Sequence, residues 1–170
     1  MAKYVIANIW SEGNIIRIPK SGDLTNCNNW REITLLAIPS KVFCIVLISR
    51  ITESVDKKLR QAQAGFRKGR GCIDHIFVLR NLLEQCHEWQ RKLLVNIVDL
   101  YKAFDSLHRC SLWEMLRNYG IPNKTVQLIK QLYANFSCTI NSEADSSYLV
   151  KSGLRQGCAM SSVLFIIAID

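Results

Sequence analysis

The segment that most constrains the fold of this chain is KLLVNIVDL, at residues 92–100. If this segment is a strand, apolar side chains lie on both of its faces, which is the pattern of a strand buried on both sides. Apolar residues recur at helical spacing before it, over residues 40–59 and 73–89, and helical patterns also follow it. We therefore expect an α+β domain in which residues 92–100 form a buried strand.

Shorter motifs mark the ends of other elements. IIRIP indicates a short strand that a proline ends. Ser40 is placed to cap the first helix, and Ser111 with Glu114 fits a capping box for a helix that ends at Gly120. The segments CTINS and SYLVKSG are expected to pair across a polar turn, before a last apolar helix begins near residue 161.

The charge of the chain is unevenly distributed. The 170 residues contain 22 Lys and Arg against 14 Asp and Glu, a net charge of +8. Residues 41–92 alone hold eleven basic and five acidic residues, a net charge of +6. This excess suits a polyanionic partner such as a nucleic acid, and a solvated helix surface is the alternative.

Seven cysteines are spread widely through the chain, and none forms a CxxC pair. This spacing does not favour a zinc site, and thiols such as Cys44 lie in apolar runs where they pack as small hydrophobic groups. We expect an intracellular, reducing compartment, either nucleus or cytoplasm. The sequence shows no signal-peptide pattern, and no apolar run approaches the roughly 20 residues of a membrane span.

Asp99 ends the apolar run, and two interpretations of it are open. It either caps the next helix or lies in a surface turn, or it holds a metal ion from the rigid end of a strand. Mg²⁺ usually takes one or two carboxylates together with substrate phosphates. The carbonyl of Leu100 would add an oxygen ligand, and Phe104 would offer a flat apolar wall to a sugar ring.

The segment GLRQGCAMSSVLF, at residues 153–165, contains a second candidate site. Gly153 and Gly157 permit a close approach between backbone and ligand. Gln156 is able to donate a hydrogen bond to a nucleotide sugar or phosphate. The alternative is a simple turn before the last helix.

The segment AGFRKGRG, at residues 64–71, is a basic loop. Its glycine backbone amides, with Arg67, Lys68 and Arg70, suit the phosphates of a triphosphate or a nucleic-acid backbone. The segment does not match the GxxxxGK[ST] pattern of a P-loop.

Taken together, these motifs resemble the reverse transcriptases of non-LTR (LINE-type) retrotransposons. GDLTNCNNWREITLLAIPSKVF is similar to the segment that leads into the fingers of that family, and QAGFRKGRGCIDHIF to the fingers motif GFRxGRxxxD. IVDLYKAFDSLHR is similar to the first palm motif, DxxKAFDS, and GLRQGCAMSSVLF to the next, G[VL]RQGxxxSPxLF. The similarity covers residues 18–170, and four motifs in family order form a specific signal where each alone is weak.

The resemblance implies a role for each matching residue. Asp99 matches the first catalytic, metal-binding aspartate, and Phe104 matches the aromatic residue that discriminates against a 2′-hydroxyl. Asp105 matches an acid that is not the principal metal ligand and is expected to hold local structure. The residues that match the nucleotide site are Leu100, Tyr101, Lys102, Ala103, Phe104, Gln156 and Gly157. The residues that match a basic, phosphate-binding fingers loop are Arg67, Lys68 and Arg70.

The sequence departs from the family pattern in three places. Glu32 stands where Gly or Pro is common, and Ser162 stands where Pro is usual. The aromatic-Ala-Asp-Asp motif, which supplies the second metal-binding site of the family, does not occur in these residues. We therefore expect a fragment of an RNA-directed DNA polymerase that is inactive alone. A non-catalytic nucleic-acid-binding module and a decayed retroelement remnant are the alternatives.

The implied architecture is the fingers and the first half of the palm of a right-hand polymerase. We expect a lead-in at residues 1–17, a fingers-like region at 18–92 and a partial palm at 93–170. The implied partners are an RNA template, a DNA primer and deoxynucleoside triphosphates, with two Mg²⁺ ions in the complete enzyme and no membrane. No feature of the sequence indicates an oligomeric state.

Overall fold

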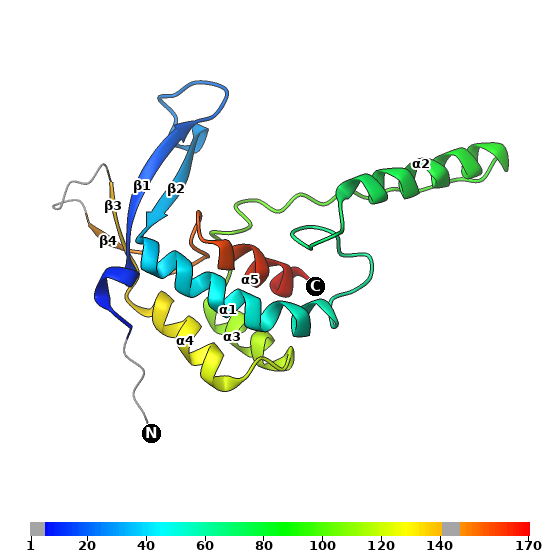
Figure 1. The fold of residues 1–170 in the computed structure, drawn as a ribbon. Coiled ribbons are helices and arrows are strands. Elements are labelled where there is room, and N and C mark those ends of the chain that lie inside the picture. The colour runs from blue at the N-terminus through cyan, green and yellow to red at the C-terminus, as the bar shows by residue number, and fades with distance from the viewer. Residues whose placement is uncertain (1–5, 141–146) are drawn as a thin grey trace.

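The computed structural model describes residues 6–140 and 147–170, which form a small sheet, a group of packed helices and one projecting helix (Figure 1). The strands are β1 (Glu12–Pro19), β2 (Trp30–Leu36), β3 (Ser137–Ile140) and β4 (Tyr148–Leu149). The α-helices are α1 (Ile38–Asp56), α2 (Cys72–Glu88), α3 (Arg109–Asn118), α4 (Asn123–Ala134) and α5 (Ala159–Ile169). Two short 3-10 helices, η1 (Asn8–Ser11) and η2 (Cys27–Asn29), precede β1 and β2.

The sheet is mixed, with strand order β2-β1-β3-β4. β1 pairs antiparallel with β2, so that Ile15 lies opposite Thr34, and parallel with β3, so that Gly13 lies opposite Cys138. β3 pairs antiparallel with β4, as the sequence predicts for CTINS and SYLVKSG. The expected polar turn between them falls on residues 141–146, outside the described residues.

The core lies between the sheet and the helices α1, α3, α4 and α5. Helix α1 contributes one apolar stripe, whereas α5 is apolar on nearly every side because neighbouring elements surround it. The most deeply buried apolar residues come from these four helices, from β3 and from the loop after α4: Cys44, Val55, Leu112, Leu116, Val126, Ile129, Leu132, Phe136, Cys138, Met160 and Leu164. The α+β prediction is therefore confirmed as a mixed α/β domain with one small sheet.

The predicted buried strand at residues 92–100 is wrong. These residues have no regular secondary structure, and the exposed fractions of Leu94, Ile97 and Val98 are 86%, 89% and 80%. An apolar run becomes a buried strand only where a sheet edge is available to pair with it. Within the described residues, the sheet contains β1 to β4 and does not include this segment.

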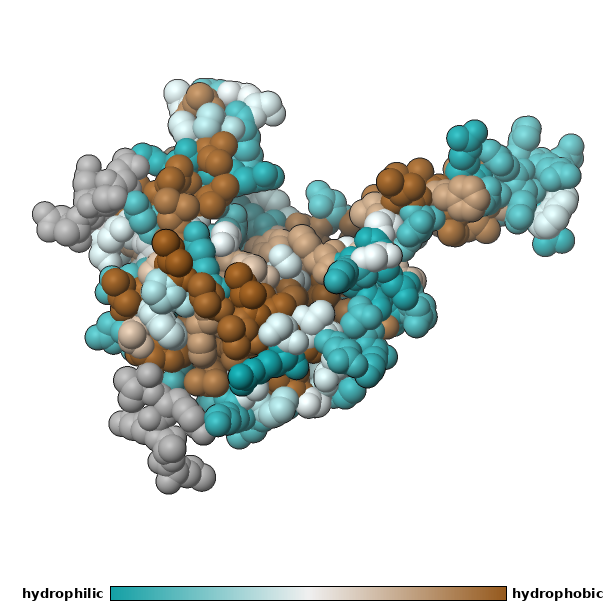
Figure 2. Space-filling model, in the orientation of Figure 1, coloured by the Kyte–Doolittle hydropathy of each residue, from teal (hydrophilic) through white to brown (hydrophobic). Residues whose placement is uncertain are grey.

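Helix α2 is present where the helical pattern predicts it, but it contributes nothing to the core. None of its residues is buried, and it extends away from the rest of the protein (Figure 1). Its apolar side chains, among them Ile73, Ile76 and Phe77, form a hydrophobic stretch on the projecting helix (Figure 2).

Two capping predictions are wrong. α1 begins at Ile38, after Ala37, and Ser40 is instead buried, with its hydroxyl donating to the Trp10 carbonyl at 3.3 Å. α3 begins at Arg109, and its N-cap is the His108 ring, which accepts a hydrogen bond from the Ser111 N–H. Asp99 therefore does not cap the helix that follows it.

The predicted ends of a strand at Pro19 and of a helix at Gly120 are confirmed. β1 ends at Pro19 and α3 ends just before Gly120, which has a φ of 73°. β2 is an additional strand that the apolar pattern did not predict, because the exposed Arg31 and Glu32 interrupt it.

The expected division at residues 17/18 and 92/93 remains a prediction. β1 crosses the first boundary, and its pairing with β3 places residues of the expected lead-in and partial palm in one sheet. Among the described helices, none combines the length and the apolar character that crossing a bilayer requires.

Candidate nucleotide site

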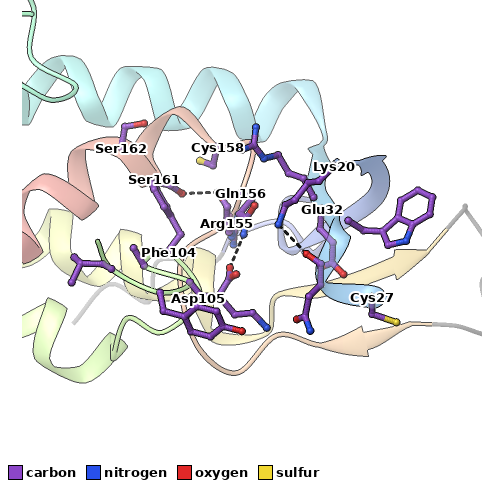
Figure 3. Close-up of a pocket in the computed structure, with 18 of the residues that line it drawn as sticks. Lys20, Cys27, Glu32, Phe104, Asp105, Arg155, Gln156, Cys158, Ser161 and Ser162 are labelled. Carbon is purple, nitrogen blue, oxygen red and sulfur yellow. Dashed lines mark hydrogen bonds between the residues drawn. The ribbon is translucent and has the colours of Figure 1, made fainter. Parts of the chain in front are cut away.

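A cavity of about 700 Å³ lies where the turn at residues 99–105, the loop at residues 155–158 and the β1–β2 hairpin meet (Figure 3). All eight residues that the sequence assigns to catalysis, metal or nucleotide line this one cavity: Asp99, Leu100, Tyr101, Lys102, Ala103, Phe104, Gln156 and Gly157. Two segments more than 50 residues apart in sequence are thus brought together at one place. The volume is within the range of small-molecule sites.

Direct hydrogen bonds join the 99–105 turn to the loop around Gln156. The side-chain amide of Gln156 donates to Asp105 Oδ1 at 2.7 Å (Figure 3). The backbone N–H of Leu154 donates to the Phe104 carbonyl at 2.8 Å. Asp105 thus makes a structural contact of the kind expected for it, and Gln156 is held at the cavity by the same bond.

Gly153 allows these two segments to approach closely. Its φ is 71°, and a Cβ atom at this position would lie 2.7 Å from both the Cα and the carbonyl oxygen of Asp105. Those atoms belong to backbone, so no side-chain rotation relieves the overlap. The glycine in GLRQG is therefore required by packing as well as by backbone conformation.

We expect Gly153→Ala to destabilise the protein by about 2–5 kcal/mol. A left-handed backbone with a Cβ costs roughly 1–2 kcal/mol, and overpacking against fixed atoms costs about 1–3 kcal/mol more. Gly69→Ala is the matched control, since its φ is 74° but no heavy atom lies within 4 Å of the added Cβ. Urea denaturation of both variants measures the difference, and equal losses of stability would show that the close contact is unimportant.

The other side of the same loop packs on β2. The Thr34 N–H donates to the Gln156 carbonyl at 2.8 Å, and a Cβ on Gly157 would lie 2.5 Å from the Thr34 carbonyl oxygen. The loop at residues 155–158 is therefore fixed between β2 and the 99–105 turn.

Phe104 both lines the cavity and packs against the protein interior. Its ring stacks on Phe165 with centroids 4.5 Å apart and an interplanar angle of 17°, and it meets the edge of Phe66 at 6.3 Å. These contacts fix the orientation of the ring.

Charges of both signs surround the cavity. The carboxylates are Asp99, Asp105 and Glu32, and the cations are Lys20, Arg31, Lys102 and Arg155. Lys20, Arg31 and Glu32 come from the β1–β2 hairpin and had no predicted role at this site. Such a mixture suits a ligand with both a metal ion and phosphates.

The oxygen donors at the cavity fit one hard divalent cation. Among residues 6–140 and 147–170, no group of three or more His, Cys, Asp or Glu side chains is arranged to hold a metal ion. Mg²⁺ needs only one or two carboxylates when phosphates and water complete its shell. Asp99 and Leu100, the two residues expected to hold the ion, both line the cavity, and their role as ligands remains a prediction.

Arg109 organises the chain beside the site, and the sequence did not reveal this role. Its guanidinium donates to the carbonyls of Gly153 (2.9 Å), Val150 (2.8 Å), Ser152 (3.0 Å) and Tyr133 (3.2 Å). Burial lowers the pKa of Arg109 from its ordinary value. One side chain therefore joins the segment at residues 150–153 to the end of α4.

Arg155 is an unusual buried cation, 2% exposed, at the inner end of the site. Its guanidinium lies 4.1 Å from the Phe136 ring centroid and 4.8 Å from that of Tyr133, and Nη1 donates to the Trp10 carbonyl at 3.3 Å. Nε and Nη2 have no hydrogen-bond partner in the described part of the chain. Burial lowers the pKa of Arg155.

The three basic residues of the 64–71 loop differ in their exposure to solvent and therefore in their ability to contact a ligand. Arg67 is 7% exposed and donates to Asp56 Oδ1 at 2.7 Å, which lowers the pKa of Asp56. Arg70 is exposed and donates to the carbonyl and side chain of Gln61. Lys68 is exposed, so the loop offers Lys68 and Arg70 to solvent, whereas Arg67 is used internally.

The fold is a mixed α/β domain with a cavity at which the predicted catalytic and nucleotide-binding residues meet. The family model described as reverse transcriptase (RNA-dependent DNA polymerase) matches residues 18–170. This chain belongs to that family. Reverse transcriptases act on nucleic-acid templates with nucleotide substrates and generally use divalent metal ions.

Curated relatives agree with this assignment. The chain is 29% identical over 155 residues to the transposon TX1 uncharacterized 149 kDa protein of Xenopus laevis, covering 90% of this chain and 12% of the relative. It is 28% identical over 155 residues to the Pol polyprotein from type-2 retrotransposable element R2DM of Drosophila melanogaster, covering 90% and 14%. The Pol polyprotein from type-1 retrotransposable element R2 of Popillia japonica is 27% identical over 164 residues, covering 95% and 23%. The predicted resemblance to non-LTR retrotransposon reverse transcriptases is confirmed, and the chain spans less than a quarter of the length of these relatives.

Proposed function

We propose that residues 18–170 form the fingers and first half of the palm of an RNA-directed DNA polymerase. The observation that carries this proposal is the convergence of Asp99, Phe104 and Gln156 on one cavity of about 700 Å³. Its substrates would be a deoxynucleoside triphosphate, a DNA primer and an RNA template. A reducing intracellular compartment, nucleus or cytoplasm, is the proposed location.

In this proposal Asp99 holds one Mg²⁺, aided by the Leu100 carbonyl. Bound Mg²⁺ would lower the pKa of the primer 3′-hydroxyl and stabilise negative charge on the phosphates of the nucleotide. A two-ion site requires carboxylates beyond those described here, such as those of an aromatic-Ala-Asp-Asp motif. We therefore propose that the 170 residues alone do not synthesise DNA.

The remaining cavity residues would position the nucleotide. Phe104, held by Phe165, presents a flat wall against which a 2′-hydroxyl would be crowded. Lys20 and Arg31 place positive charge on the hairpin side of the cavity, where a triphosphate would be neutralised. Gln156, fixed by Asp105, supports the nucleotide and template from the opposite segment.

A second candidate function is a non-catalytic nucleic-acid-binding module. The net charge of +6 over residues 41–92, with Lys68 and Arg70 exposed, favours it independently of the cavity. Both functions require an affinity for nucleic acid, so its measurement is the first experiment.

We expect the chain to bind RNA and primed duplex with little sequence preference, because phosphate contacts supply the affinity. Lys68→Glu combined with Arg70→Glu should weaken binding to every sequence and reduce the slope of log K against log salt by about 1–2. Fluorescence anisotropy with labelled RNA across a salt series measures both effects. Arg67 is left unchanged because its ion pair with Asp56 holds the loop.

The matched control is Arg117→Glu combined with Lys151→Glu. Both residues are exposed and lie outside residues 41–92, so the change in net charge is identical. If the two double variants weaken RNA binding equally, the basic loop has no specific role and only the overall charge of the chain matters.

A further inference from the structure

Two buried thiols meet next to the cavity. Cys44 lies within α1, and Cys158 is the N-cap residue of α5. Their Sγ atoms are 3.6 Å apart and share a hydrogen bond, and the two residues are 1% and 7% exposed. Cys158 also lines the cavity (Figure 3), whereas Cys44 does not.

The surroundings of Cys158 stabilise a thiolate. The hydrogen bond with Cys44, the backbone N–H groups of Met160 and Ser161, and the charge of Arg155 lower the pKa of Cys158 from its ordinary value, against the effect of burial. The same hydrogen bond and burial raise the pKa of Cys44. An N-terminal helix position and a nearby arginine are the environment in which cysteines become nucleophilic.

The buried charge of Arg155 independently favours a negative charge beside Cys158. The guanidinium is 2% exposed, and it makes no ion pair with a carboxylate in the described part of the chain. Two of its nitrogens have no hydrogen-bond partner there. A thiolate at Cys158 would supply the missing opposite charge, since these two groups interact favourably.

We propose that Cys158 and Cys44 form a redox-responsive dithiol, which peroxide oxidises to a disulfide that ties the 155–158 loop to α1. Closing the two sulfurs to a bond of about 2.05 Å requires a movement of about 1.5 Å. Peroxide reaches Cys158 from the cavity that this residue lines. Cys44 acts as the resolving thiol.

The chemistry balances with peroxide as the oxidant. The Cys158 thiolate attacks one peroxide oxygen, the O–O bond breaks, and the other oxygen leaves as hydroxide and takes up a proton to become water. Cys44 then attacks the sulfenic sulfur, so that an S–S bond forms, the S–O bond breaks, and the hydroxyl leaves as water with the Cys44 proton. One peroxide is reduced to two waters as the two thiols lose two electrons.

The Cys44–Cys158 disulfide would lie next to the candidate nucleotide site. Gln156 is two residues before Cys158, and it donates to Asp105 while its carbonyl accepts from Thr34. Moving Cys158 toward α1 would displace these contacts. The effect on nucleotide binding rests on the proposed function, whereas the covalent step does not.

The test uses the full chain with the exposed or partly exposed Cys27, Cys72, Cys86 and Cys110 replaced by Ser, which leaves three buried thiols. After treatment with hydrogen peroxide, we expect a Cys44–Cys158 linked peptide in a non-reducing digest, with the loss of two hydrogen atoms and reversal by a thiol reductant. Cys44→Ala should abolish the linked peptide completely. Cys138→Ala is the matched control, because Cys138 is also 1% exposed, and it should leave the linkage unchanged.

Circular dichroism melting establishes that each variant is folded, and Cys158→Ala is the second variant if Cys44→Ala does not fold. Retention of all three thiols would overturn the proposal, as would sulfinic acid at Cys158 without linkage or equal linkage to Cys138. This test measures disulfide formation and uses no polymerase or RNA-binding assay. A negative result would therefore contradict the dithiol proposal without contradicting the proposed function.

Discussion

Asp99→Asn is expected to abolish primer extension in a longer chain that carries the aromatic-Ala-Asp-Asp motif. The substitution keeps the size of the side chain and removes the charge that would hold the metal ion. A loss of about 4 kcal/mol of transition-state stabilisation corresponds to about 10³-fold in rate. Single-nucleotide extension of a DNA primer on an RNA template measures it, with circular dichroism and RNA binding expected to stay near the parent values.

Asp105→Asn is the matched control for this experiment. It lies six residues away, lines the same cavity, and an asparagine Oδ1 still accepts the hydrogen bond from Gln156. We expect it to keep most of the activity. Near-normal synthesis by Asp99→Asn would mean that Asp99 does not hold the catalytic ion.

Phe104→Ala is expected to admit ribonucleotides in the same longer chain. Removing the ring opens space where a 2′-hydroxyl would lie, so the ratio of kcat/KM for ribonucleotides to that for deoxyribonucleotides should rise by roughly 10–200-fold. Steady-state incorporation of matched ribo- and deoxyribonucleotides measures the ratio.

Phe165→Ala separates this effect from a loss of packing. Phe165 makes the same stacking contact with Phe104, and it does not line the cavity. It should destabilise the protein and change the preference for the sugar much less than Phe104→Ala does, because the Phe104 ring is still present and still meets Phe66. An unchanged ratio in Phe104→Ala, or an equally large change in both variants, would mean that Phe104 acts through packing alone.

Several helices and the ends of some elements could be predicted because they depend on residues that are close in sequence. The helices α2, α4 and α5 follow apolar spacing, and Pro19 and Gly120 end their elements through backbone restriction. The candidate site could be predicted for a similar reason, since its residues lie in two short motifs. Their meeting at one cavity is a property that only the structure displays.

The errors arise where a residue depends on a distant partner. Residues 92–100 have strand-like composition, but a strand forms only with a neighbour, and none pairs with them within the described residues. The contacts of Arg109 and Arg155 were not predicted because the hydrogen-bond acceptors of their side chains lie 24 or more residues away. Arg67 looks like its basic neighbours in sequence, yet its ion pair with Asp56 removes it from the surface.

The position of the incoming nucleotide decides whether the cavity beside Asp99 is the polymerase site. It can be measured in a structure of the longer chain bound to an RNA template, a DNA primer, Mg²⁺ and a deoxynucleoside triphosphate. We expect the triphosphate to lie beside Asp99 with a shared Mg²⁺ and the sugar to rest against Phe104. A nucleotide bound elsewhere, with this cavity empty, would contradict this expectation.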